Sequence, residues 1–191
     1  MSLLSECEKT ENSSTAFFKG KITSLDPPNK KADVIHTLEG GEIETKTVSY
    51  ATLFLTNDSS AQGFNDMVDM ENLNEAELLY NIQRRYEKNA IFTYVGPTLL
   101  VVNPYQKIPE LVTPETLYNY QKKVYEATYN IKDSNPHVYA IGAQCIRKLC
   151  ETKKNQAIVI SGESGAGKTE NTKMAMKFIT SIGKFTQRKL Y

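Results

Sequence analysis

Residues 156–169, "QAIVISGESGAGKT", decide how this chain folds. The short apolar run "QAIVIS" is typical of a strand that is buried on both faces of a parallel sheet. The glycine-rich stretch "GESGAGKT", residues 162–169, follows it directly and fits the pattern G-x-x-x-x-G-K-[ST] of a phosphate-binding loop. Beyond the loop, "KTENTKMAMKFI" predicts a helix with Met174, Phe178 and Ile182 on one face. The sequence therefore supplies strand, loop and helix in the order that such a loop requires.

Each type of residue in this loop has a chemical role. Glycines let the backbone come close to a phosphate and adopt dihedral angles that a side chain disfavours. Backbone N–H groups then face the anion, and the positive end of the following helix adds to the attraction. Lys168 is the predicted catalytic residue, because its charge stabilises the β- and γ-phosphates, and Thr169 is the predicted Mg²⁺ ligand. The alternative is a glycine-rich turn that binds nothing. The residues expected to contact the nucleotide are Gly162, Glu163, Ser164, Gly165, Ala166, Gly167, Lys168 and Thr169.

The rest of the chain divides into parts of different composition. Residues 1–15 are polar and predict a flexible N-terminus. Residues 16–58 hold β-rich runs separated by "DPPNKK" and "EGGE", which predict a small antiparallel β unit. The polar stretch 56–66 predicts a linker, with a domain boundary near residue 60. Residues 62–191 then alternate helical patterns with apolar runs, as expected of an α/β domain.

Local signals place the elements of this second part. A capping pair predicts a helix at 75–88, a Gly-Pro turn separates two strands, and two X-Pro pairs open further helices. His137 lies in the first turn of the last of these helices, and we interpret it as structural rather than catalytic. The signals are Asn74 with Glu77, Gly96–Pro97, Thr113–Pro114 and Asn135–Pro136.

Composition excludes several classes of protein. The 191 residues are 40% hydrophobic and 24% charged with a formal charge of +1, which indicates a globular protein without the basic surface that nucleic acids require. Cys7, Cys145 and Cys150 lack the spacing of a disulfide framework or zinc site, so we expect a reducing, intracellular location. The longest uncharged stretch, residues 90–106, contains Gly-Pro and Asn-Pro breaks and is short for a membrane span.

Several stretches of this sequence resemble one protein family. The stretch "GESGAGKTENTK" resembles the phosphate loop of the myosin motor (head) domain almost letter for letter. Upstream, "LNEAELLYNIQRRYEKNAIFTYVGPTLLVVNPYQKIPE" resembles the segment that leads into the purine-binding loop, and "NPHVYAIGAQCIRKL" resembles a helix of the same domain. The β unit at 16–56 is similar to the small Src-homology-like barrel that precedes many myosin heads. The strong similarity covers about residues 62–185.

The resemblance implies an α/β fold, namely an incomplete P-loop NTPase-type, mostly parallel sheet with flanking helices, preceded by a small antiparallel β-barrel. It implies ATP and Mg²⁺ as cofactors, actin filaments as a partner of the full-length protein, and a location in the cytoplasm with the cytoskeleton. It places Asn103, Pro104 and Tyr105 beside the adenine. Gln106 stands where the family usually has a lysine, and Leu111 where an aromatic ring commonly packs on the purine, so the base contacts are expected to differ.

Two segments of a myosin head are missing from these residues. Neither Asn-x-x-Ser-Ser-Arg nor Asp-x-x-Gly-Phe-Glu follows Thr169, and no further strand follows the last helix. We therefore expect the N-terminal portion of a head, with its actin-binding surface elsewhere. One alternative is a stand-alone P-loop ATP-binding protein or kinase, which requires a downstream acidic Mg²⁺ partner. The other is a non-catalytic interaction module in which the barrel binds a partner.

The missing segments lead to a prediction. Hydrolysis needs groups that position water and respond to the γ-phosphate, and these are what the two segments supply. We expect the purified 191-residue chain to show weak or no ATP hydrolysis and no stimulation by actin filaments. Phosphate-release kinetics would measure this. A turnover rate like that of an ordinary ATPase would contradict it.

Overall fold

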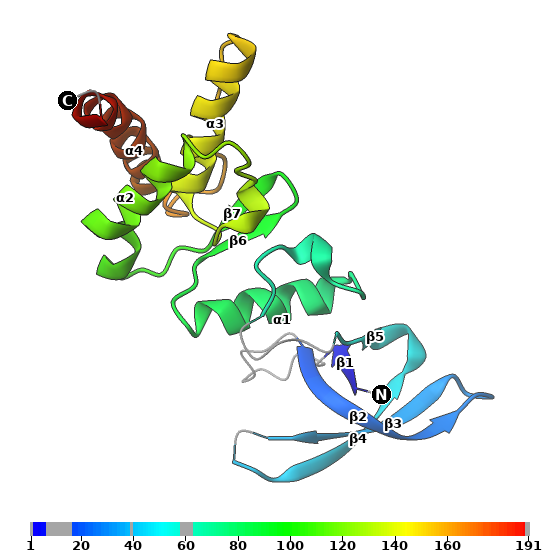
Figure 1. Ribbon diagram of the computed structural model, residues 1–191. Helices are drawn as coiled ribbons and strands as arrows, with labels where there is room; N and C mark the ends of the chain where they lie inside the picture. Colours follow the sequence, from blue (N-terminus) through cyan, green and yellow to red (C-terminus); the bar gives the residue numbers. More distant parts are fainter. Residues whose placement is uncertain (1, 7–16, 39, 58–62, 190–191) are drawn as a thin grey trace. The chain divides into compact units, whose positions relative to one another are not determined.

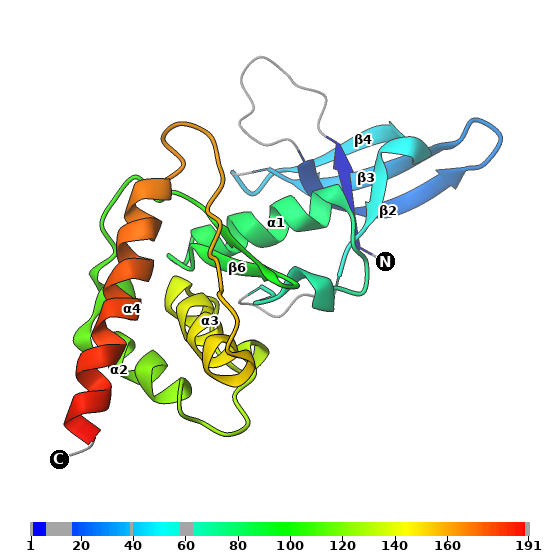
Figure 2. The same cartoon turned by 90° about the horizontal axis from the view of Figure 1, so that it is seen from above.

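The computed structural model describes residues 2–6, 17–38, 40–57 and 63–189. The chain divides into two compact units, one of residues 1–64 with 69–84, and one of residues 65–68 with 85–191. Figure 1 labels the elements and Figure 2 shows them from above. In this division, most of the first helix is grouped with the N-terminal sheet.

The first unit is built on a five-stranded antiparallel sheet of order β4-β3-β2-β1-β5. This confirms the antiparallel unit predicted for 16–58 and is consistent with a Src-homology-like start. Residues 2–6, which we expected to be flexible, instead form β1, which pairs with β2 on one side and β5 on the other. Residues 7–15 of the expected flexible segment, and residue 16 of the predicted β unit, lie outside the described residues. The strands are β1 (Ser2–Glu6), β2 (Phe17–Asp26), β3 (Lys31–Thr37), β4 (Ile43–Ser49) and β5 (Leu53–Leu55).

Asn57, in the stretch that we predicted as a linker, bonds to residues at the start of helix α1 (Glu75–Tyr86), and residues 58–62 of that stretch lie outside the described residues. The Asn57 side chain donates to the Glu77 carboxylate at 2.7 Å and to the Asn72 carbonyl at 2.9 Å, and it accepts from the Asn72 N–H at 2.6 Å. Asn74 caps the helix by accepting from the Glu77 N–H at 3.0 Å, as predicted. The Glu77 carboxylate therefore accepts a hydrogen bond from Asn57, which lies between β5 and the helix.

The second unit packs three helices beside a β-hairpin. Helices α2, α3 and α4 contact one another, and their shared core includes Phe92, Tyr120, Tyr139 and Phe178. Phe178 and Ile182 are buried and Met174 packs on this core, which confirms the predicted apolar face of the last helix. The elements are β6 (Phe92–Val95), β7 (Thr98–Val101), α2 (Pro114–Lys123), α3 (Val138–Thr152) and α4 (Lys168–Lys189). Short 3-10 helices occur at Tyr50–Thr52, Met67–Asp69, Pro109–Val112 and Ile131–Asp133.

The parallel sheet that we predicted is not confirmed. Residues 156–161 carry no regular secondary structure, and the ladders between the described strands are all antiparallel. The described residues show a parallel pairing only at the isolated bridge of Asp66 with Tyr94. A strand needs a neighbour whose N–H and C=O groups complete its ladder. No described strand lies against residues 156–161, and Val159 is 87% exposed.

His137 caps helix α3, which begins two residues after Pro136. Its Nδ1 accepts from the Tyr139 N–H at 3.0 Å, and its Nε2–H donates to the Leu111 carbonyl at 2.9 Å. The ring is 3% exposed and lies 4.7 Å from the Phe92 ring and 5.2 Å from the Tyr120 ring, centroid to centroid. Burial lowers the pKa of His137 to about 4. The structural role predicted for this residue is confirmed.

This buried histidine makes stability depend on pH. The folded pKa of about 4 lies below the unfolded value of 6.5, so between these values the unfolded chain binds a proton that the folded chain does not. Stability is retained above pH 6.5 and falls as the pH drops to about 4, by about 3 kcal/mol in total. Urea unfolding at pH 7 and pH 4.5 measures the loss. His137→Asn keeps a capping oxygen without titrating, so its loss over this range should be smaller; an equal loss would exclude His137 as the cause.

Candidate phosphate-binding loop

The predicted phosphate loop stands at the start of α4, and packing against α3 fixes that start. The Phe178 side chain is fully buried and covers Gly142, where a β-carbon would lie only 2.6 Å from Phe178 Cδ1. The rings of Tyr139 and Phe178 also stack at 5.3 Å. From the end of α3 the chain passes through Lys153, which has a left-handed φ of 56°, and returns to the first turn of α4 (Figure 2).

Glycines give the loop its backbone path. Gly165 has a φ of 80° and Gly167 a φ of 91°, both in the region that L side chains disfavour. The Ala166 N–H donates to the Glu163 carbonyl at 3.2 Å and closes a tight turn. Asn171, in the first turn of α4, donates from its side-chain amide to the Gly167 carbonyl at 3.0 Å. The sequence thus places glycine where the turn requires it.

The carbonyl groups of the loop are held by protein donors. The Lys168 ammonium donates to the carbonyls of Gly162 and Glu163, both at 2.7 Å. The side-chain amide of Asn103 donates to the Gly165 carbonyl at 2.6 Å. In the described part of the chain, the N–H groups of Gly165 and Gly167 have no protein acceptor. A loop whose acceptors are occupied and whose donors are not is suited to an anion.

The surroundings of Thr169, the predicted Mg²⁺ ligand, can be compared with what Mg²⁺ requires. Thr169 is exposed, and its hydroxyl forms no hydrogen bond to another described residue. No group of three or more His, Cys, Asp or Glu residues within the described ranges could hold a metal ion. Mg²⁺ usually keeps several waters and takes few protein oxygens together with phosphate oxygens. The Thr169 hydroxyl is compatible with this kind of site.

The segment that the resemblance placed beside the adenine lies against the loop through Asn103. Tyr105 is 85% exposed, and the Pro104 carbonyl accepts from the Tyr86 hydroxyl at 3.5 Å. Gln106 donates to the Asn89 side chain at 3.4 Å. Sequence reasoning did not foresee the bond from Asn103 to Gly165. Its partners are 62 residues apart, and no local pattern marks such a pair.

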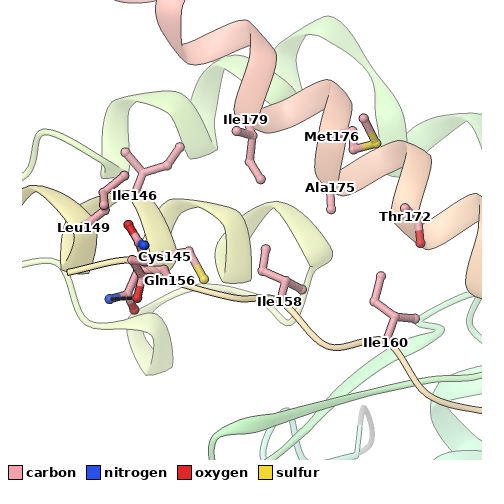
Figure 3. A pocket seen from close by; sticks show the side chains of 11 residues that line it. Cys145, Ile146, Leu149, Gln156, Ile158, Ile160, Thr172, Ala175, Met176 and Ile179 are labelled. Carbon is pink, nitrogen blue, oxygen red and sulfur yellow. Dashed lines mark hydrogen bonds between the residues drawn. The ribbon is translucent and has the colours of Figure 1, made fainter.

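A separate open groove of roughly 580 Å³ lies between α3, α4 and the extended segment before the loop (Figure 3). Ile158 and Ile160 point into it from the extended segment, opposite Met176 and Ile179 of α4. Among the residues that the structure describes, no charged side chain lines it. An apolar groove does not suit a triphosphate, so the groove and the loop are distinct features.

The loop geometry leads to a prediction with opposite signs at two glycines. Gly167→Ala places a side chain at a φ of 91°, which should cost about 1–2 kcal/mol of unfolding free energy. Gly183 lies exposed within α4 with nothing within 4 Å of an added β-carbon, so Gly183→Ala should stabilise by about 0.5–1 kcal/mol. Urea denaturation of both variants measures these effects. Equal effects of the two substitutions would show that Gly167 is not conformationally constrained.

Within the described residues, no helix has both the length and the apolar character needed to cross a membrane.

Comparison with known proteins gives consistent results. The family model described as myosin head (motor domain) matches residues 64–190. The chain is 37% identical over 164 residues to Myosin-3 of Arabidopsis thaliana, covering 86% of this chain and 13% of that protein. It is 41% identical over 128 residues to unconventional myosin-VI of Sus scrofa, covering 67% of this chain and 10% of that protein. The chain thus spans about a tenth of the length of the curated relatives it matches.

Proposed function

The chain belongs to the myosin head (motor domain) family, and on this basis we propose that it binds Mg-ATP through residues 162–169 as part of an actin-based motor. In the whole protein, hydrolysis of the bound ATP would drive movement along actin filaments in the cytoplasm. We thus propose Mg-ATP as the ligand, residues 162–169 as the loop that binds it, and actin filaments as the partner. The matched region, residues 64–190, contains the entire loop.

One observation carries the proposal. The loop begins a 22-residue helix, its carbonyls are occupied by Lys168 and Asn103, and the N–H groups of Gly165 and Gly167 have no acceptor among the described residues. Aligned peptide dipoles place partial positive charge at the start of such a helix. N–H donors, helix end and ammonium together favour a multiply charged anion, and a triphosphate is the anion that this loop pattern binds.

Different residues would make different contacts with the bound Mg-ATP. The backbone N–H groups of Gly165 and Gly167, which have no acceptor among the described residues, would donate to the phosphate oxygens. Lys168, whose ammonium lies 2.7 Å from two carbonyls of the loop, would place its charge against the β- and γ-phosphates. Thr169 would contribute its hydroxyl to Mg²⁺, which neutralises phosphate charge when bound. Pro104 and Tyr105, next to Asn103, would form the wall beside the adenine.

Removing the ammonium should remove most of the affinity. Charge-assisted hydrogen bonds contribute roughly 1.5–3 kcal/mol each, so Lys168→Ala should weaken Mg-ATP binding at least about tenfold. Titration calorimetry of the purified chain at pH 7 and moderate salt measures the change. The comparison is made at one ionic strength because screening alters charge contributions.

Lys173→Ala provides a control with the same change of charge. Lys173 is one turn further along α4, and its exposed side chain pairs with Glu170 at 2.7 Å. Surface ion pairs contribute little, so Lys173→Ala should bind Mg-ATP almost as the native chain does. If both variants lose affinity equally, general charge attraction rather than the loop holds the nucleotide. If Lys168→Ala binds normally, the proposed site is wrong.

A further inference from the structure

We infer that Asn103 positions the phosphate loop, so that affinity for the triphosphate, and not recognition of the base, depends on its side-chain amide. This inference rests on the proposed function of residues 162–169 and deepens it. The resemblance placed Asn103 beside the adenine only as a member of a loop. The contacts of its side chain assign it a different partner, the Gly165 carbonyl.

Gly165 lies in a part of the loop where a single contact determines its position. A β-carbon added there would meet nothing within 4 Å, so the side on which a side chain would project is open. Glycine is also the residue whose backbone is least restricted. The Gly165 N–H has no protein acceptor among the described residues. Its carbonyl, 2.6 Å from Asn103 Nδ2, is therefore the group through which this residue is held.

The Asn103 side chain is itself held by a second hydrogen bond. Its Oδ1 accepts from the Tyr105 N–H at 2.9 Å, which makes a local turn around Pro104. Proline restricts the backbone in the middle of that turn. An N–H needs an acceptor and a carbonyl needs a donor, so the two bonds together determine which way the amide faces. A side chain bound at both ends can restrain another segment.

The Asn103 side chain also lies close to a second loop residue, Gly167. A β-carbon on Gly167 would lie 4.0 Å from Asn103 Cγ, so the amide lies next to Gly167 as well as bonding Gly165. Gly165 and Gly167 have left-handed φ values of 80° and 91°. Holding the Gly165 carbonyl reduces the conformations that the loop loses when it binds an anion, and such preorganisation raises affinity.

The inference makes a prediction about ligand classes. Asn103→Ser keeps an oxygen that can accept from the Tyr105 N–H, but it is too short to reach the Gly165 carbonyl. Loss of one hydrogen bond should weaken binding about threefold to tenfold. Because the effect acts through the loop, the same factor should apply to Mg-ATP, Mg-GTP and Mg-tripolyphosphate. Asn103→Asp, which also lacks the donor, should lose at least as much for all three.

The experiment combines calorimetry with an observation that needs no ligand. Dissociation constants of the three probes are measured for the native chain, for both Asn103 variants and for Asn130→Ser. Asn130 is a matched control, because its Oδ1 accepts from the Lys132 N–H at 3.1 Å in a similar turn away from the loop. The carbonyl ¹³C resonance of Gly165 is recorded in each free protein. It should move in the Asn103 variants and stay unchanged in Asn130→Ser.

The outcomes separate the inference from the function on which it rests. Equal losses for all three probes, with a shifted Gly165 carbonyl, support positioning. A loss confined to Mg-ATP overturns the inference in favour of base recognition, and so does an unshifted carbonyl. If the native chain binds none of the probes, the proposed function fails, and the resonance alone then decides whether Asn103 restrains the loop. A general loss of stability would instead appear as a lowered unfolding temperature.

Discussion

The close packing of α4 on α3 is the contact on which the rest of the second unit depends. Phe178 lies against Gly142, where no larger residue would fit, and its ring stacks on Tyr139. Gln121 of α2 donates to Ser181 of α4 at 2.8 Å and holds the same helix from another side. Because a helix is stiff, fixing its buried face also fixes its first turn. The loop before this helix is therefore held at a defined position next to Asn103.

The loop is organised by the pairing of its acceptors rather than by an excess of positive charge. With a net charge of +1, the chain has no general attraction for anions. Lys168 and Asn103 occupy carbonyls of the loop, and Asn171 occupies the carbonyl of Gly167. Backbone donors remain, at the positive end of a long helix. A loop of this kind would thus need few charges to attract a phosphate, because its own oxygens are already bonded.

Sequence predicted those features that local rules determine. The glycine pattern, the apolar face of α4, the hairpin at Gly96–Pro97 and the capping role of Asn74 depend on neighbouring residues, and the structure contains each of them. Contacts between distant residues were not predictable from such rules. Asn57 with Glu77, and Asn103 with Gly165, carry no local signal. Residues 156–161 have strand-like composition, but composition supplies no partner strand, so the predicted parallel sheet was not confirmed.

The central claim is that the loop itself binds a magnesium–triphosphate nucleotide. Titrating the ¹⁵N-labelled chain with Mg-ATP and following its amide resonances tests this most directly, because each loop N–H reports separately. Saturable shifts are expected at Gly165, Gly167 and Lys168, with little change at Ile158 and Met176 in the apolar groove. Loop resonances that stay constant while others saturate, or no shifts at all, would contradict it.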